Sequence, residues 1–255
     1  MIPHLPNDFL QVPLAHRALH DIEAGRPENS RAAICAALAV GYGIEIDVQL
    51  SADGQAMVFH DYALDRLTPQ TGAVRLRSAA ALGDVPLTGG AECIPALPEV
   101  LNLVAGQVPL LIELKDQDGG MGPDIGPLED AVARALAGYS GPVAMMSFNP
   151  HSVGRLAEIL PEIPRGITTS AYTPADWLLP RATCDRLREI PDFDRTGASF
   201  ISHEVEDLRR ARVAQIKSSG AGVLCWTVRS PDQERQARLV ADNITFEGYL
   251  PALRP

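Results

Sequence analysis

Short apolar runs alternate along the chain with stretches in which apolar residues recur at helical spacing. Eight of these runs are predicted to be strands, at residues 12–16, 44–48, 110–115, 143–148, 165–169, 199–203, 223–227 and 243–246. The stretches between them predict helices, at residues 30–40, 98–104, 128–137, 152–160, 181–188, 208–217 and 232–240. Strands that alternate with helices form a parallel sheet, and eight such units are typical of a closed (β/α)8 TIM barrel. An open doubly wound sheet is the alternative, but neither G-x-G-x-x-G nor a P-loop is present to support nucleotide binding.

The second predicted strand continues into a β-hairpin arm. An Asp-Gly dipeptide, which favours a tight reversal, follows the apolar run of this strand. Counting residue pairs back from a two-residue turn sets Phe59 opposite Val48 and His60 opposite Asp47. The hairpin is therefore expected to bring a histidine beside an acidic residue of the strand.

The segment from residue 61 to 93 is polar, contains glycine and lacks the periodicity of a barrel unit. We interpret it as a small insertion over the site after the second strand, because long connections in compact domains usually serve function. No repeat, low-complexity tract or linker divides the chain. Residues 1–255 are therefore expected to form a single domain.

The net charge of the chain limits the kinds of molecule that it is expected to bind. Lys and Arg number 22 and Asp and Glu number 32, which gives a net charge of −10, whereas nucleic-acid binding needs a basic surface. We expect no nucleic-acid partner, and a small anionic substrate would need local positive groups or a metal ion. No apolar run approaches the roughly 18 residues of a membrane span, and the first residues do not resemble a signal peptide. A cytoplasmic protein without stable membrane insertion is expected.

The cysteines are consistent with a reducing compartment. They are widely spaced, form no C-x-x-C pair and have mostly apolar neighbours. We therefore predict four free, buried thiols without a catalytic role. These residues are Cys35, Cys93, Cys184 and Cys225.

Three acidic residues lie where two of the predicted strands end. Alternation along a strand places Glu45 and Asp47 on one face, and it places Glu113 and Lys115 together in the same way. Because the C-terminal ends of barrel strands meet at one rim, the three carboxylates can face one point. Buried like charges need a proton or a cation, and carboxylate oxygens suit Mg²⁺ or Ca²⁺ rather than Zn²⁺. The simpler alternatives are a solvated strand face and a salt bridge of Lys115.

Two histidines and two basic residues complete the candidate site. His16 and Arg17 close the first strand, and His60 ends the hairpin. Two groups that titrate near neutrality can deprotonate a nucleophile and protonate a leaving oxygen during displacement at phosphorus. Arg17 and Lys115 would supply positive charge for a phosphate. A lone histidine is more often structural, but two histidines beside three acids favour catalysis.

These residues belong to short motifs that cover nearly the whole chain. The motifs are L-A-H-R-A, P-E-N-S, E-I-D-V-Q-L-S-x-D-G, V-F-H-D-x-x-L-D-R-L-T, I-P-A-L-P-E-V-L, I-E-L-K, S-F, C-W-T-V and N-I-T-F-E-G-Y-L-P. In this order they resemble the glycerophosphodiester phosphodiesterase family, and the short insertion resembles its cytoplasmic bacterial type. The resemblance implies a metal-dependent barrel that hydrolyses glycerophosphodiesters to glycerol 3-phosphate and an alcohol, through a cyclic phosphate that water opens. It implies metal ligation by Glu45, Asp47 and Glu113, acid/base catalysis by His16 and His60, phosphate contacts by Arg17 and Lys115, and a pocket wall formed by Trp226.

Two positions depart from the pattern of that family. Ala18 stands where the family usually has glycine, and Glu247 stands near the place of the family's usual acid, so the role of this acid is open. A lysophospholipase D-like or sugar-phosphodiester hydrolase activity on the same site is the alternative function. A non-catalytic phosphate-binding module is a further one.

Three other polar or aromatic residues receive structural interpretations. Phe148 is predicted to lie in the core rather than in the pocket. Glu28 is interpreted either as a residue that orients a site residue or as a loop residue ahead of a helix cap, and the second alternative is favoured. His203 ends a predicted strand, so it is expected either to face the substrate or to support the residues that do.

Overall fold

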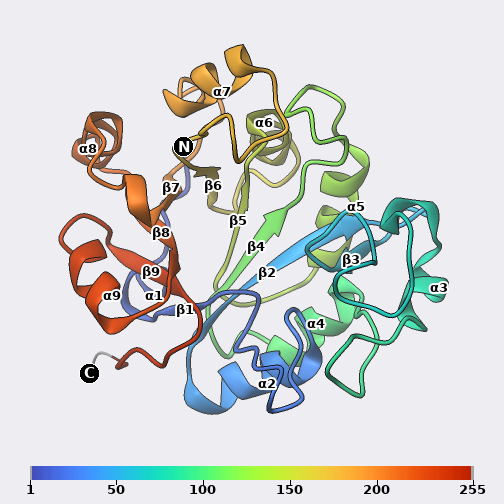
Figure 1. Cartoon of the computed structure of the whole chain (residues 1–255). Coiled ribbons are helices and arrows are strands. Elements are labelled where there is room, and N and C mark those ends of the chain that lie inside the picture. The colour runs from blue at the N-terminus through green and yellow to red at the C-terminus, as the bar shows by residue number, and fades with distance from the viewer. Residues whose placement is uncertain (1, 254–255) are drawn as a thin grey trace.

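The computed structural model describes residues 2–253 and shows a barrel of parallel strands surrounded by helices (Figure 1). Within these residues the barrel has eight strands and is closed, because the first strand pairs with both the second and the last. The barrel strands are β1 (Leu14–Ala15), β2 (Gly43–Leu50), β4 (Leu110–Leu114), β5 (Val143–Ser147), β6 (Arg165–Thr169), β7 (Phe200–Glu204), β8 (Gly222–Val228) and β9 (Asn243–Phe246). The predicted (β/α)8 TIM barrel is confirmed.

Helices connect successive barrel strands and cover the outside of the barrel (Figure 1). They are α2 (Arg31–Val40), α4 (Leu97–Val104), α5 (Pro127–Leu136), α6 (Pro150–Ile159), α7 (Arg181–Arg188), α8 (Ala211–Ser218) and α9 (Pro231–Ala237). Ser30 is the N-cap of α2, as expected from its sequence position, and its Oγ accepts a hydrogen bond from Ala33 N at 3.1 Å. None of the described helices is long and apolar enough to cross a lipid bilayer.

Two helices are shorter than predicted, and two short helices, α1 (Asp8–Gln11) and α3 (Ala79–Gly83), were not predicted. α8 begins at Ala211 because the preceding residues form a 3₁₀ turn, η2 (Val205–Asp207), followed by a turn in which Arg210 N bonds to Asp207 O. α9 ends at Ala237, where hydrogen bonds of the tighter 3₁₀ type replace the helical pattern. The helix α1 (Asp8–Gln11) places Phe9 in the interior of the barrel.

The side chains of the barrel strands alternate between two hydrophobic clusters. Ile46 and Ile112 belong to the larger cluster, which lies between the strands and the surrounding helices. Leu111 packs inside the barrel with Phe9 and Phe200. This alternation confirms that the polar side chains of β2 and β4 point into the barrel mouth.

The strand β3 (Ala56–Val58) pairs with β2 outside the barrel as the predicted hairpin, but the predicted register is wrong by one residue. Val48 lies opposite Val58 instead of Phe59. The backbone N–H of Phe59 donates to Asp47 O at 3.0 Å, so Phe59 rather than His60 is the neighbour of Asp47. His60 follows the ladder and still reaches the barrel mouth, where it lines a cavity with Asp47.

The register differs because the hairpin loop has three residues rather than two. Ser51 N donates to Gln55 O at 2.9 Å, which leaves residues 52–54 as the loop. Gly54 adopts a left-handed conformation with φ of 76°, the geometry of a three-residue turn that ends on glycine. An Asp-Gly pair is compatible with both loop lengths, so the dipeptide alone could not separate them.

The insertion, residues 61–93, lies beside β3 and has a hydrophobic cluster of its own (Figure 1). Its regular elements are the 3₁₀ turn η1 (Val74–Leu76) and the helix α3 (Ala79–Gly83). Leu64 and Leu82 pack in this cluster with Phe59 of the hairpin. The insertion is therefore anchored on the hairpin that carries His60.

The prediction for the cysteines is only partly right. All four are free, and Cys184 and Cys225 are buried as expected. Cys35 is exposed and Cys93 is partly exposed. Cys35 lies on α2, a helix whose outer face meets solvent, so apolar neighbours in the sequence did not imply burial.

We expect Gly166→Ala to destabilise the fold. Gly166 and Gly222 lie on either side of Phe200 in adjacent strands, and a Cβ at Gly166 would lie 2.3 Å from the Phe200 ring. Overpacking of this kind costs about 1–3 kcal/mol in the free energy of unfolding, measurable by denaturant titration. Gly83→Ala is the control, since its Cβ would meet no atom within 4 Å. Equal stability of the two variants would contradict the prediction.

Candidate active site

Three buried carboxylates from neighbouring barrel strands meet at the barrel mouth. β2 carries Glu45 and Asp47, β4 carries Glu113, and Asp47 lies opposite Glu113 in the parallel ladder. The exposed fractions of the three residues are 2%, 2% and 5%. One oxygen from each carboxylate lies within 4.8 Å of the others. The structure thus brings together the three acids that the sequence singled out.

The ammonium group of Lys115 lies against this cluster. Its Nζ donates to Glu113 Oε1 at 2.6 Å and to Asp47 Oδ1 at 3.1 Å. Burial acts to raise the pKa of Asp47, but the nearby positive charges, that of Lys115 first, together with the hydrogen bond from Asn29 outweigh it, and the pKa lies well below its usual range. The salt bridge considered as an alternative for Lys115 therefore exists as part of a larger charged cluster.

Glu45 forms no ion pair with any residue in the range 2–253. Its Oε2 accepts a hydrogen bond from the backbone N–H of Arg17 at 2.8 Å. Burial, reinforced by the carboxylates of Asp47 and Glu113, raises the pKa of Glu45 well above its ordinary value. A buried carboxylate in this state lacks a compensating cation.

The donor set fits a hard divalent cation. Ca²⁺ binds oxygen ligands at about 2.3–2.6 Å and Mg²⁺ at about 2.0–2.1 Å, so oxygens on opposite sides of such an ion are about 4–5 Å apart. The three carboxylate oxygens of Glu45, Asp47 and Glu113 lie within 4.8 Å of one another, and no thiolate or imidazole is among them. These residues can therefore hold Mg²⁺ or Ca²⁺, and such an ion would keep Glu45 ionised.

His16 is held at the mouth by a carboxylate. Its Nδ1 lies 2.6 Å from Glu247 Oε2, and Glu247 Oε1 accepts a hydrogen bond from Arg229 at 2.7 Å. The hydrogen bond from His16 is the largest of the effects that keep the pKa of Glu247 below its usual range. An ionised Glu247 holds the proton on Nδ1, which leaves Nε2 of His16 as a free acceptor. Burial lowers the pKa of His16 below 6.5, against the opposing effect of Glu247.

His60 is held in a closely similar way. Its Nδ1 lies 2.6 Å from Asp61 Oδ1, and Arg66 contacts both oxygens of Asp61 at 2.7 Å. Burial acts to raise the pKa of Asp61, but the hydrogen bonds from Arg66 and His60 outweigh it, and the pKa is lowered. Both candidate histidines line the mouth, and the Nδ1 of each contacts a carboxylate that an arginine also contacts.

Arg17 is fixed beside the acids by a residue that we had interpreted as a simple loop residue. Glu28 Oε1 accepts from Arg17 Nη1 at 2.9 Å, and it also accepts from Arg66 of the insertion at 2.9 Å. Arg17 Nε lies 3.7 Å from Asp47 Oδ2. Of the two alternatives for Glu28, the favoured one was therefore wrong, and the structure agrees with the other, in which Glu28 orients a site residue. Asn29 was not singled out either, although it donates to Asp47 Oδ2 at 3.0 Å and accepts from Asp47 N at 3.2 Å.

Aromatic side chains line a cavity of about 360 Å³ next to the acids. Trp226 is among them, as expected, and its Nε1 donates to Ser202 O at 3.1 Å. Phe148 also lines the cavity, with its ring 5.5 Å from Trp226 and 5.0 Å from Trp177, so its assignment to the core was wrong. The same cavity is bordered by Glu113.

His203 has a structural role. Its side chain is fully buried, with Nδ1 2.7 Å from Thr169 Oγ1 and Nε2 3.4 Å from Asp207 Oδ2. It lies on the same face of β7 as Ile201, which packs toward the helices. Of the two alternatives for His203, contact with substrate is therefore excluded.

The pairing of each histidine with a carboxylate was not predicted from the sequence, in which the role of Glu247 was left open. Asp61 follows His60 directly, which is a local signal for such a pair. Glu247 lies 231 residues from His16, and its only signal is its position just after the last strand of a closed barrel. Closure of the barrel brings the first and last strand ends together.

Comparison with known proteins agrees with these observations. The model of the glycerophosphoryl diester phosphodiesterase family matches residues 16–245. YhdW of Bacillus subtilis strain 168 is 31% identical over 224 residues, covering 84% of this chain and 85% of that protein. A glycerophosphodiester phosphodiesterase of Caldanaerobacter subterraneus is 29% identical over 231 residues, covering 86% and 87% of the two chains.

Solved structures share the same barrel. A phosphodiesterase of Oleispira antarctica, in complex with the product sn-glycerol-3-phosphate, has a TM-score of 0.73 at 26% identity over 95% of this chain and 93% of that one. A glycerophosphodiester phosphodiesterase of Thermotoga maritima has the same fold, with a TM-score of 0.69 at 20% identity over 92% and 94%. This chain therefore belongs to the glycerophosphoryl diester phosphodiesterase family and is a phosphoric diester hydrolase.

Proposed function

We propose that this enzyme hydrolyses glycerophosphodiesters to glycerol 3-phosphate and an alcohol with the help of a divalent cation held by Glu45, Asp47 and Glu113. The observation that carries the proposal is the cluster of three buried carboxylates within 4.8 Å of one another, in which Glu45 lacks a cationic partner among residues 2–253. Members of the family generally use a divalent cation. The Oleispira relative binds sn-glycerol-3-phosphate, one product of this reaction.

The charges around the cluster suit a phosphodiester monoanion. A bound Mg²⁺ or Ca²⁺ would stabilise negative charge as it develops on the phosphate oxygens. Arg17 and Lys115 contact Asp47 at the edge of the cluster, and their donors are proposed to bind the phosphate oxygens. Trp226 is proposed to form an apolar wall for the substrate, since it lines the cavity beside Glu113.

His16 and His60 are proposed as the acid/base pair. Burial lowers the pKa of His16, so its Nε2 is unprotonated at neutral pH and accepts the proton of the attacking glycerol hydroxyl. His60, as the imidazolium, gives its Nε2 proton to the alcohol oxygen as the bond from that oxygen to phosphorus breaks. In the second step the roles reverse: His60 takes a proton from water, and His16 returns its proton to the glycerol oxygen as the cyclic phosphate opens. The result is the addition of one water molecule across the diester.

The chain is further proposed to work as a single domain. The insertion buries Leu64 and Leu82 against Phe59 of the hairpin rather than forming an isolated unit. Its Arg66 also contacts Glu28, which holds Arg17 of the barrel. The insertion and the barrel therefore build one site.

Replacing His16 or His60 by alanine should lower turnover of glycerophosphocholine and glycerophosphoethanolamine by about 10²–10⁴-fold, the usual contribution of a general acid or base. Release of glycerol 3-phosphate measures turnover, and circular dichroism checks that each variant is folded. His4→Ala is the matched control, because His4 is exposed. Near-normal turnover in both variants would exclude the proposed roles.

Removal of divalent cations should abolish turnover, and added Mg²⁺ or Ca²⁺ should restore it. Glu113→Gln should weaken binding of the ion in a calorimetric titration, because one of three charged ligands is lost, and should lower turnover accordingly. Glu158→Gln, with its carboxylate on the surface, is the control. Full activity of the chelated wild-type enzyme would contradict a metal-dependent reaction.

Glu247→Gln should change the pH dependence of the enzyme. Glu247 raises the pKa of His16, so its loss lets the pKa fall further below 6.5. A general base is inactivated as the pH falls through its pKa, so the acidic limb of the kcat/KM profile should move to lower pH. The maximum value of kcat/KM should also fall, because the tautomer of His16 is less firmly held. An unchanged acidic limb would mean that Glu247 does not act through His16.

A further inference from the structure

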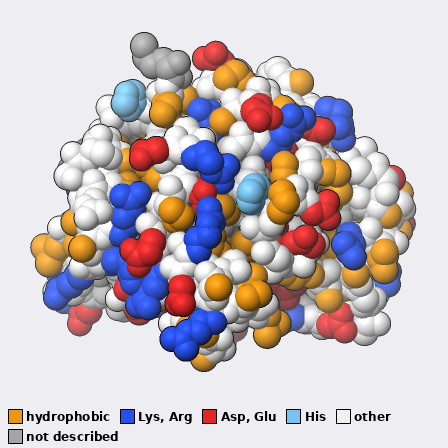
Figure 2. Space-filling model, turned by 90° about the horizontal axis from the view of Figure 1, so that it is seen from above, with side chains coloured by type: hydrophobic (Ala, Val, Ile, Leu, Met, Phe, Trp, Pro, Cys, Tyr) orange, Lys and Arg blue, Asp and Glu red, His pale blue; other side chains and the backbone are white. Residues whose placement is uncertain are grey.

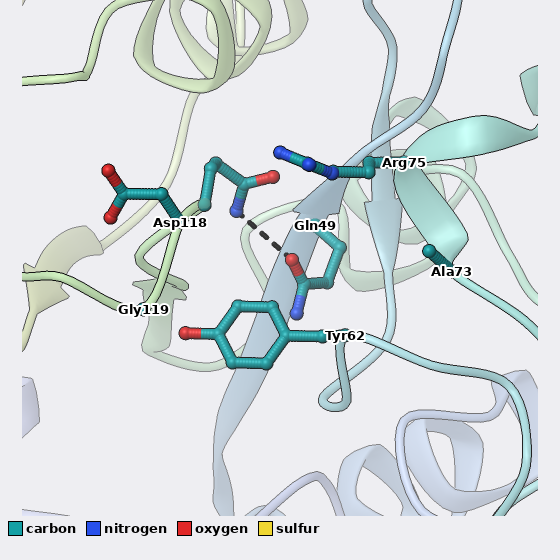
Figure 3. Close-up of a pocket in the computed structure, with 7 residues that line it drawn as sticks. Gln49, Tyr62, Ala73, Arg75, Asp118 and Gly119 are labelled. Carbon is teal, nitrogen blue, oxygen red and sulfur yellow. Dashed lines mark hydrogen bonds between the residues drawn. The ribbon is translucent and has the colours of Figure 1, made fainter. Parts of the chain in front are cut away.

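A second cavity, of about 270 Å³, lies between the insertion, which contributes Tyr62 and Arg75, and the loop after β4, which contributes Asp118 (Figure 3). Tyr62 belongs to the walls of both cavities, since it also lines the aromatic cavity that contains His60 and Glu113. The residues that line the second cavity have no part in the proposed hydrolysis. They are Gln49, Tyr62, Ala73, Arg75, Gln117, Asp118 and Gly119.

The floor of this cavity continues the two strands that carry the acids. Gln49 follows Asp47 by two residues, and Gln117 follows Lys115 by two residues. A strand advances about 3.3 Å per residue, so Gln49 of β2 lies about 7 Å beyond Asp47. Gln117 lies in the loop after β4, where its Nε2 donates to the backbone oxygen of Lys115. A ligand in this cavity would therefore lie next to a phosphate bound by Lys115.

The two glutamines are rigidly held. Gln117 Nε2 donates to Gln49 Oε1 at 3.0 Å and to Lys115 O at 2.6 Å. Gln49 Nε2 donates to His60 O at 3.0 Å, and Gln117 Oε1 accepts from Leu50 N at 3.2 Å. The amides are thus largely occupied by one another and by the backbone. Recognition in the cavity depends on the charged residues around them.

Two opposite charges lie at opposite edges of the cavity (Figure 3). Arg75, in η1 of the insertion, forms no ion pair or side-chain hydrogen bond with a residue in the described range, whereas Arg66 and Arg77 of the same segment both have partners. Asp118, in the loop after β4, accepts a hydrogen bond from Gly120 N at 2.7 Å through one oxygen. The Asp118 side chain is exposed and borders the cavity, and its carboxylate lies beside that of Asp116.

We propose that this cavity binds the leaving alcohol of the substrate and selects an alcohol that carries a carboxylate and an ammonium group, such as serine. The inference rests on the proposed hydrolysis of glycerophosphodiesters. The guanidinium of Arg75 pairs with the carboxylate in a bidentate manner, and Asp118 accepts from the ammonium group. The phenol of Tyr62 closes the side toward the catalytic centre. Its pKa is raised to about 12, mainly by burial, so its hydroxyl stays protonated as a donor.

Other common alcohols interact favourably with only one of the two charged residues, or with neither. Choline and ethanolamine carry a cation that Asp118 attracts but Arg75 repels. Glycerol carries no charge, so it gains from neither residue. An unpaired guanidinium beside a cationic alcohol is a repulsive element, and such elements contribute to specificity as much as attractive ones do.

The test compares kcat/KM for glycerophosphoserine, glycerophosphoethanolamine, glycerophosphocholine and glycerophosphoglycerol. The wild-type enzyme should favour glycerophosphoserine by about tenfold or more, the usual effect of one charged hydrogen-bonded pair. Arg75→Gln should remove this preference, mainly through KM, while the value for glycerophosphocholine stays the same or rises. Arg75→Lys should keep part of the preference. Asp118→Asn should lower kcat/KM for the two substrates with a primary ammonium group and leave kcat/KM for glycerophosphoglycerol unchanged.

Arg209→Gln is the matched control, because Arg209 is an arginine outside both cavities. A wild-type enzyme without preference for glycerophosphoserine would overturn the inference. So would an Arg75→Gln substitution that lowers kcat/KM for all four substrates by the same factor. In either case the hydrolysis itself would stand. Failure of the wild-type enzyme to cleave any of the four diesters in Mg²⁺ or Ca²⁺ would instead overturn the proposed function and this inference with it.

Discussion

Repulsion among three buried carboxylates is the interaction on which the rest of the site depends. Two unit charges about 5 Å apart repel by about 3 kcal/mol at the effective dielectric constant of a protein site. The barrel imposes this arrangement, because β2 and β4 are adjacent and in register at Asp47 and Glu113. Lys115 and the amide of Asn29 offset part of the repulsion. The part that remains at Glu45 makes the site a strong attractor for a cation.

A second set of acids surrounds the first. Unlike Glu45, each acid of this outer set is paired with a basic side chain. Glu28, Asp61 and Glu247 each lie between an arginine and a residue of the mouth. Arg66 is the main group that keeps Glu28 and Asp61 ionised, whereas at Glu247 the hydrogen bond from His16 contributes most and Arg229 adds to it. Each carboxylate fixes the orientation of the inner side chain. This is why a chain with an excess of acidic residues can present an organised set of donors to a phosphate. On the face shown in Figure 2, acidic and basic side chains are interspersed.

Much of this architecture could be predicted from local patterns. Strict alternation along β2 and β4 set the inward positions of Glu45, Asp47, Glu113 and Lys115, because the period of a strand leaves no other choice. The hairpin register could not be predicted in the same way, since it depends on whether the loop has two or three residues. Contacts between distant segments were also out of reach. Glu247 meets His16 only because β1 and β9 close the barrel.

Aromatic residues show a further limit of pattern reading. A phenylalanine at the end of a buried strand satisfies the same apolar pattern whether it packs in the core or lines a cavity. Phe148 lies half-buried among other rings, which depends on a loop that brings Trp177 to it. The path of that loop decides whether such a phenylalanine packs in the core or lines a cavity.

The anchoring of His60 has a consequence for how the enzyme loses activity. Phe59, the preceding residue, is buried in the small hydrophobic cluster of the insertion rather than in the barrel. Small clusters open more readily than a full domain core, so heat or denaturant would loosen this layer first. The histidine would then leave its place while the barrel persisted. Inactivation would precede melting, and the enzyme would regain its function on cooling without having to refold as a whole.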